Sequence, residues 1–166
     1  MELRRPSLED KEAILEMMAE FEQAQSPHDG GFWETEAFSY EEWLDGNQNQ
    51  EIGINLPEGW VPAIQLVAFS EKGQAVGFLN LRLCLNDYLL EEGGHIGYSI
   101  RPTERGKGYA KEALRQGLQV AKEKNIKQAL VTCSTENPVS RAVIVANGGV
   151  FEDVRNGVER YWIDLE

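Results

Sequence analysis

The chain has 166 residues, of which 42% are apolar, so it is long enough for a single domain with its own hydrophobic core. Its 28 acidic residues outnumber its 16 basic residues and give a formal net charge of −12, which argues against nucleic-acid binding. The same charge attracts a cationic small molecule or a basic peptide, although it also serves solubility alone.

The sequence shows no signal for a membrane, an export leader or a metal. Its N-terminus lacks an apolar leader region, and no apolar run reaches the ~18 residues of a transmembrane helix. Cys84 and Cys133 lie far apart in apolar runs, without a Cys-x-x-Cys pair or clustered histidines. We therefore expect a cytoplasmic protein with buried, reduced thiols, no membrane partner and no metal site.

The first third of the chain predicts one strand and two helices. Residues 1–5 are typical of a strand that Pro6 ends, and Ser7 is placed to cap a helix, with Asp10 following in its first turn. Apolar residues then recur at helical spacing from Ile14 to Phe21. Residues 25–49 are polar and aromatic, and they predict a turn at 28–31 and a short helix at 40–44.

The rest of the chain predicts strands interleaved with helices. Residues 61–69 and 74–85 form an antiparallel hairpin, a loop follows at 86–94, and a strand at 95–100 ends before Pro102. A helix at 110–122 carries a face of small apolar residues that favours close packing on a sheet. A strand at 128–134, a helix at 138–147 and a hairpin of strands at 150–154 and 159–165 complete the chain. The predicted order is β, α, α, β, β, β, α, β, α, β, β, an α/β class without repeats or linkers.

The segment between the strand at 95–100 and the helix at 110–122 is the strongest functional signal. It reads Arg-Gly-Lys-Gly-Tyr-Ala-Lys over residues 105–111, and its glycines allow a tight bend in which backbone N–H groups converge on one anion. A Walker A loop is excluded because Lys107 is followed by Gly108 rather than Ser or Thr. The dinucleotide fingerprint is disfavoured because Lys111 stands at its third glycine. The segment is either a phosphate-binding turn or an ordinary glycine-rich loop with solvated charges, and its basic neighbours are Arg101, Arg105, Lys107 and Lys111.

These residues resemble the GNAT superfamily of acyl-CoA-dependent N-acyltransferases. Its signature, Gln/Arg-x-x-Gly-x-Gly/Ala, is matched at every constrained position by residues 105–110, and residues 94–102 look like the strand that precedes it. Residues 137–141 resemble the family's Asn-x-x-Ser/Ala step, and residues 148–152 resemble its Gly-Phe strand entry. The resemblance implies one acyl-CoA N-acyltransferase domain over residues 1–166, with a mixed, largely antiparallel sheet flanked by helices and splayed central strands.

The resemblance also implies a binding site for acetyl-CoA as co-substrate, without a metal. Backbone N–H groups of the glycine turn would bind its pyrophosphate, namely those of Arg105, Gly106, Lys107, Gly108, Tyr109 and Ala110. Backbone groups of Tyr98, Ser99 and Ile100 would bond the pantetheine amides, and one N–H would stabilise the developing oxyanion. Asn137 and Ser140 would contact the pantetheine arm, although Asn137 is equally suited to cap a helix.

The implied reaction is direct attack of a primary amine on acetyl-CoA in a ternary complex, which needs a proton acceptor and a proton donor. Many relatives carry a Tyr acid where this chain has Ile144, and some carry a Glu base where it has Thr132. The remaining catalytic candidates are His95, Tyr98 and Glu136, with Tyr161 possible on the last strand.

Two of these candidates also have structural interpretations. His95 ordinarily titrates near neutrality, which suits a base, but a histidine on a strand is more often solvated or held in the core. Tyr98 shares a side of its strand with Ile96 and Ile100, which suits core packing.

The missing Tyr and Glu favour a non-catalytic acyl-CoA-binding module as the alternative function, and a nucleotide-phosphate binder is a third. The acceptor stays open among aminoglycosides, polyamines, amino-acid derivatives and protein amines, and a homodimer is allowed. Residues 27–33 suit either a lid over the acceptor or simple packing. Glu91 and Glu92, with Asp87 nearby, suit either attraction of a cationic amine or a solvated acidic loop.

Overall fold

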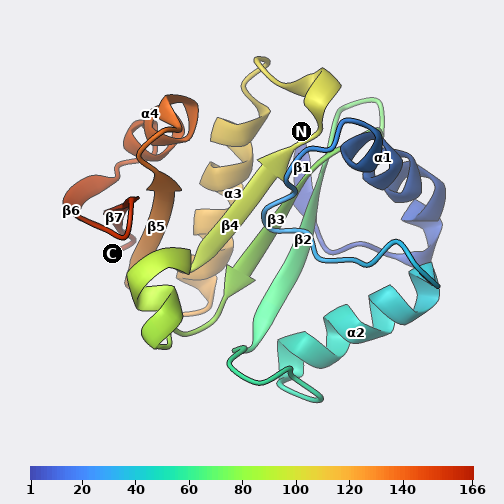
Figure 1. Cartoon of the computed structure of the whole chain (residues 1–166), viewed down its shortest axis with the longest axis horizontal. Helices are drawn as coiled ribbons and strands as arrows, with labels where there is room; N and C mark the ends of the chain where they lie inside the picture. The colour runs from blue at the N-terminus through green and yellow to red at the C-terminus, as the bar shows by residue number, and fades with distance from the viewer.

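A seven-stranded sheet forms the centre of the computed structural model, which describes all 166 residues (Figure 1). The strands are β1 (Glu2–Arg4), β2 (Ala63–Phe69), β3 (Ala75–Arg82), β4 (Ile96–Ile100), β5 (Gln128–Ser134), β6 (Val150–Arg155) and β7 (Val158–Asp164). Their spatial order is β1-β2-β3-β4-β5-β7-β6, and every neighbouring pair is antiparallel except β4 and β5. The predicted class and the predicted order of elements are therefore confirmed.

Four longer helices cover the two faces of this sheet. They are α1 (Lys11–Gln23), α2 (Tyr40–Ile52), α3 (Tyr109–Glu123) and α4 (Pro138–Ala146). Figure 1 shows α1 and α2 together on one side of the molecule, with α3 and α4 on the other. Ser7 precedes a short 3-10 turn (Leu8–Asp10) that leads into α1, and its N–H donates to the Asp10 carboxylate at 2.9 Å.

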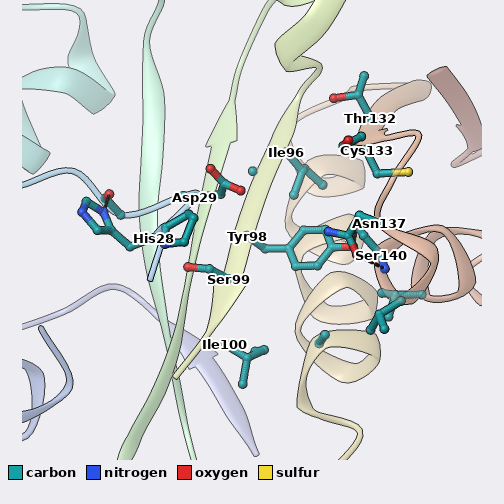
Figure 2. Close-up of a pocket in the computed structure, with 18 of the residues that line it drawn as sticks. His28, Asp29, Ile96, Tyr98, Ser99, Ile100, Thr132, Cys133, Asn137 and Ser140 are labelled. Atoms are coloured by element: carbon teal, nitrogen blue, oxygen red, sulfur yellow. Dashed lines mark hydrogen bonds between the residues drawn. The ribbon is translucent and has the colours of Figure 1, made fainter. Parts of the chain in front are cut away.

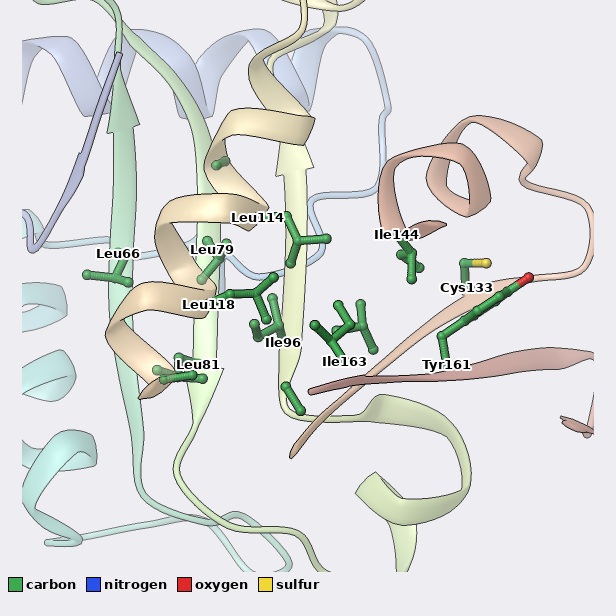
Figure 3. Close-up of a cluster of buried hydrophobic side chains, with 14 of the residues drawn as sticks. Leu66, Leu79, Leu81, Ile96, Leu114, Leu118, Cys133, Ile144, Tyr161 and Ile163 are labelled. Carbon is green, nitrogen blue, oxygen red and sulfur yellow. The ribbon is translucent and has the colours of Figure 1, made fainter. Parts of the chain in front are cut away.

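Two hydrophobic clusters, one on each face, hold the layers together. Ile14 of α1 and Trp43 of α2 pack with Phe78 on one face, and the larger cluster in Figure 3 joins Leu114 of α3 and Ile144 of α4 to the other face. Strands β2 and β3 are buried on both faces, which explains why their sequences are almost continuously apolar.

Helix α3 lies close to the sheet because of the small residues on its inner face. A Cβ added to Gly117 would lie 2.8 Å from Leu79 of β3, so any larger residue would push the helix outward. The predicted close packing is confirmed. This contact holds α3 against the sheet, and the glycine turn directly precedes the first residue of α3.

A helix and a loop differ from the sequence expectation. The short helix expected at 40–44 instead runs to Ile52, where Gly53 ends it in a left-handed conformation with φ of 80°. Its added turns are mostly polar and lack the apolar period that reveals a helix. The loop expected at 86–94 contains a π-helical turn, Leu89–Gly93, that buries Leu89.

The cysteines differ from each other in exposure. Strand β3 ends at Arg82, so Cys84 lies beyond the sheet and is exposed, whereas Cys133 on β5 is buried. The expectation that both thiols are buried was wrong for Cys84. None of the helices combines the length and apolar character needed to cross a membrane.

Candidate active site

A cleft of about 1200 Å³ opens where β4 and β5 separate. These parallel strands pair at one position only, Ile96 with Val131, and then diverge, which confirms the predicted splay. The cleft is lined by β4, the end of β5, the glycine turn, the start of α4 and residues 26–32 (Figure 2). It therefore connects the glycine turn to the first residues of β4.

The side of β4 that faces β5 offers unpaired backbone groups to the cleft. In an antiparallel pair, alternate residues bond to the neighbouring strand, and the N–H of Arg101 donates to Val76 of β3 at 2.8 Å. By this alternation Ser99 bonds to β3, whereas Tyr98 and Ile100 direct their N–H groups toward β5. Of the three predicted backbone contacts, the alternation supports Tyr98 and Ile100. Ser99 instead contributes a buried Oγ that has no hydrogen-bond partner.

The glycine turn has the open geometry that an anion site requires. Gly106 and Gly108 have φ of 78° and 87°, and no protein atom lies within 4 Å of a Cβ added to either. Helix α3 begins directly afterwards at Tyr109, so its first N–H groups face this free space. The conformation needs glycine, and the space around it suits an approaching phosphate.

The basic residues around the turn have different roles. Arg105 lines the cleft, where its guanidinium donates to the Ile100 carbonyl at 2.9 Å, and Lys111 lines it as well. Lys107 is engaged in an ion pair with Glu104.

Arg101 does not belong to the predicted basic patch. Its side chain is 5% exposed, and it bonds to Glu16 and Glu20 of α1 at 2.8 Å each. It joins α1 to the end of β4 and cannot reach a ligand. Arg101 is therefore close to the turn in sequence but is not among the basic side chains that surround it.

Tyr98 reaches across the cleft to α4 (Figure 2). Its hydroxyl lies 2.8 Å from Ser140 Oγ, and burial raises the pKa of Tyr98 to about 12, so the phenol keeps its proton at neutral pH. Asn137 caps α4 through Oδ1, which accepts from the Ser140 N–H at 3.1 Å, and Asn137 also lines the cleft. Ser140 is thus fixed by Asn137 and in turn holds Tyr98.

His95 and Glu136 do not line the cleft. His95 is 7% exposed, and its Nδ1 accepts from the Leu130 N–H at 2.9 Å. Burial and the nearby Arg82 lower the pKa of His95 to about 4, below the near-neutral value of an ordinary histidine. Glu136 is exposed in the turn before α4.

Tyr161 also lies outside the cleft. It is buried on β7, where its hydroxyl donates to Glu159 at 3.0 Å. Glu159 in turn pairs with Arg141 at 2.7 Å, so Tyr161 belongs to a structural network beneath α4.

Residues 26–32 are packed onto β4. A Cβ on Gly30 would lie 2.3 Å from the Gly97 carbonyl oxygen, and the Gly30 carbonyl accepts from Gln65 at 2.7 Å. His28 stacks on Trp33 with ring centroids 3.7 Å apart. The packing interpretation of this segment therefore describes the structure, and the segment brings Asp29 to the wall of the cleft.

The sequence analysis assigned no individual role in the cleft to three polar residues that line it. Asp29 comes from residues 26–32, Cys133 from β5, and Arg82 from the end of β3. A signal for Arg82 was present, because a cation inside the apolar run of a strand needs either a partner or a purpose. Cys133 lies among apolar residues and gives no such signal.

The splayed strands, the cleft between them and the open glycine turn are the features expected of an acyl-CoA-dependent N-acyltransferase. The chain also matches the model of the acetyltransferase (GNAT) domain over residues 1–150. It belongs to this family and is an acyl-CoA-dependent acetyltransferase with acetyl-CoA as the acyl donor. No curated protein sequence shows significant similarity to it.

Solved structures share the same fold at low identity. A chimera of the spermidine N-acetyltransferase SpeG from Vibrio cholerae and hSSAT is 19% identical, with a TM-score of 0.62 and coverage of 99% of this chain and 97% of that chain. A putative acetyltransferase from Salmonella typhimurium, solved with its cofactor acetyl-CoA, is 16% identical, with a TM-score of 0.63 and coverage of 99% and 94%. An acetyltransferase from the same organism that modifies the N-terminal serine of ribosomal protein L7/L12 is 18% identical, with a TM-score of 0.65 and coverage of 99% and 94%.

Proposed function

We propose that the chain acts as one domain, residues 1–166, that transfers the acetyl group of acetyl-CoA to a primary amine by direct attack in a ternary complex. The observation that carries this proposal is the unpaired edge of β4, which runs inside the cleft and ends at the glycine turn. An extended ligand with amides along its length and a pyrophosphate at one end matches such an edge.

The residues present fit acetyl-CoA. The N–H groups from Arg105 to Ala110 would hold the pyrophosphate, with Lys111 nearby, and the backbone of Tyr98 and Ile100 would bond the pantetheine amides. When bound, acetyl-CoA supplies an activated acyl group as a thioester. The Tyr98 N–H would then polarise the thioester carbonyl and stabilise the negative charge that develops on its oxygen.

Tyr98 is our candidate for the proton donor. Its hydroxyl reaches the region of α4 where relatives carry an acidic tyrosine, and Ser140 fixes its direction. Because burial keeps the phenol protonated, it can donate a hydrogen bond to the departing thiolate.

Asp29 is our candidate for the group that accepts the amine's proton. It lines the cleft, and its carboxylate accepts no hydrogen bond from the protein, whereas Glu92 in the same cleft accepts one from Asn156. We assign no step of the reaction to His95 or Glu136, because both lie outside the cleft.

Cys133 supports direct attack over an acyl-cysteine route. It lies in the cleft, but burial raises its pKa to about 11, which leaves a thiol rather than the nucleophilic thiolate at neutral pH. This supports direct attack by the amine over transfer through Cys133.

The acceptor is proposed as an amine that is cationic before it reacts. The negative charge of the chain and the carboxylates Asp29 and Glu92 in the cleft support this. Spermidine and the N-terminal serine of a ribosomal protein are acceptors of structural neighbours, so a small amine or a peptide is plausible. The exposed free thiol of Cys84 supports a reducing compartment such as the cytoplasm.

The test is release of free CoA from acetyl-CoA across a panel of amines, with acetyl-CoA binding measured separately by calorimetry. Acceptor-dependent release is expected, and Tyr98→Phe is expected to lower kcat by about 10²-fold while acetyl-CoA still binds. Ser140→Ala should show a smaller loss in the same direction.

A non-catalytic acyl-CoA-binding module is the second candidate, because Ile144 and Thr132 stand where relatives carry acid and base residues. Tight acetyl-CoA binding without acceptor-dependent release from any amine would establish this second function and overturn the first.

A further inference from the structure

The arginines of this protein fall into two groups. All except Arg82 and Arg105 form ion pairs with carboxylates: Arg4, Arg5, Arg101, Arg115, Arg141, Arg155 and Arg160. Both exceptions line the cleft. In a chain with 28 acidic residues, the two arginines without a carboxylate partner both line one cleft, so their positive charges are not neutralised by an ion pair there.

These two arginines lie at opposite ends of β4. Arg105 follows Ile100 at the end of the strand, beside the glycine turn that would hold the donor's pyrophosphate. Arg82 lies beside the start of β4, because its N–H donates to the His95 carbonyl at 2.7 Å and its guanidinium contacts Gly97. On the proposed function, the donor's phosphates would lie at the far end of β4, which would leave the part of the cleft beside Arg82 for the acceptor.

The Arg82 guanidinium is poorly satisfied by the protein. Its only hydrogen bond is a long one, 3.4 Å from Nη1 to the Gly93 carbonyl, although the group has five N–H donors. Burial lowers the pKa of Arg82, which shows the cost of holding this charge in the cleft wall. Tyr88 and Asp29 lie near it without forming an ion pair.

The backbone is shaped to admit this guanidinium. A Cβ on Gly97 would lie 3.1 Å from Nη1 and 3.3 Å from Nη2 of Arg82, so a side chain at that position would crowd it. Gly30, in residues 26–32, packs against the carbonyl oxygen of Gly97. The absence of a side chain at Gly97 thus leaves room for the guanidinium beside β4, and most of its N–H donors have no protein partner.

We propose that the acceptor amine also carries a carboxylate and that Arg82 binds it, which makes amino acids or their derivatives the substrate class. The inference rests on the proposed transferase function and names its acceptor. A carboxylate accepts two parallel N–H bonds from a guanidinium, the pairing that Arg82 lacks within the protein. The ammonium end of the same molecule would face Asp29 and Glu92, which line the same cleft.

The test compares each amino acid with its carboxamide in the CoA-release assay, at equal concentrations of neutral amine. We expect kcat/KM to favour the carboxylate form by at least about 30-fold, since hydrogen bonds between charged groups are strong and the carboxamide leaves the cation unpaired. Arg82→Gln should reduce this preference to within about threefold of unity. Arg82→Lys keeps the positive charge but cannot form two parallel bonds to a carboxylate, so its preference for the carboxylate form should lie between those of the wild type and Arg82→Gln.

Arg115→Gln is the matched control, because Arg115 lies on the exposed side of α3 away from the cleft. It should retain the full preference. Equal rates for acids and carboxamides in the wild-type protein, or a preference that survives in Arg82→Gln, would overturn the inference while leaving acetyl transfer intact. If the Gln variant does not fold, an unchanged preference in Arg82→Lys overturns it instead.

A second measurement separates this inference from the proposed function. With CoA present, N-acetyl amino acids and their carboxamides are titrated into the wild-type protein and into Arg82→Gln by calorimetry. If no amine is acetylated, the transferase proposal fails, but tighter binding of the carboxylate forms that disappears in Arg82→Gln still supports the Arg82 site. Equal binding of both forms overturns it.

Discussion

Replacing Gly108 with Glu tests the assignment of the glycine turn. Gly108 has φ of 87° and open space around its Cβ position, so the cost to folding that we expect is that of the left-handed backbone, about 1–2 kcal/mol. A carboxylate about 5 Å from one phosphate charge is repelled by about 0.8 kcal/mol in bulk water and about 3 kcal/mol at an effective dielectric constant of 20. The two charges of a pyrophosphate double this repulsion, so the Kd for acetyl-CoA should rise at least about tenfold.

Gly73→Glu is the control for Gly108→Glu. Gly73 lies in the turn between β2 and β3, has φ of 81° and has equally open surroundings, but it is not part of the cleft. Both variants should lower Tm by about 2–8 °C, because each pays the same backbone cost in a chain of this length. Calorimetric titration of acetyl-CoA should show weakened binding for Gly108→Glu alone. Unchanged affinity in that variant, or equal loss in both, would refute the turn as the pyrophosphate site.

Four further predictions follow from the surroundings of single side chains. Cys133→Ala should keep transferase activity, and a loss of turnover with normal acetyl-CoA binding would instead indicate an acyl-cysteine. In the folded protein at pH 8, the exposed Cys84 should react with iodoacetamide and the buried Cys133 should not. The Arg141 guanidinium lowers the pKa of Glu159 to about 2. The ionised carboxylate therefore stabilises the fold fully above its unfolded pKa of about 4.3, and this stabilisation is lost as the pH falls toward 2. The urea concentration at the midpoint of unfolding should fall over this pH range in the wild type and fall less in Glu159→Gln. His95→Gln should leave the neutral limb of the pH–rate profile in place, because a group with a pKa of about 4 does not titrate there; a lost limb would reinstate His95 as the base.

The glycine turn and the order of elements were readable from the sequence because both depend on local chemistry. A left-handed backbone at Gly106 and Gly108 is a property of these residues themselves, and the alternation of strands and helices follows from apolar spacing. The extension of α2 beyond residue 44 could not be predicted, because its added turns are mostly polar and lack the apolar spacing that reveals a helix.

The roles of charged side chains were less readable, because their partners are remote in sequence. Arg101 resembles a flanking phosphate contact until Glu16 and Glu20, more than 80 residues earlier in the chain, are brought beside it. Arg82 shows the reverse case. It is part of an apolar strand, and only the fold reveals that no carboxylate reaches it.

The net charge of the chain alone favours a cationic acceptor, yet the cleft presents charge of both signs. A polyamine would bring ammonium groups toward Asp29 and Glu92, but a second ammonium near Arg82 would be repelled by it. An amino acid satisfies both regions, because its amine approaches the carboxylates while its own carboxylate approaches the guanidinium. The position of Arg82, opposite the glycine turn along β4, therefore selects among acceptors that the overall charge cannot distinguish.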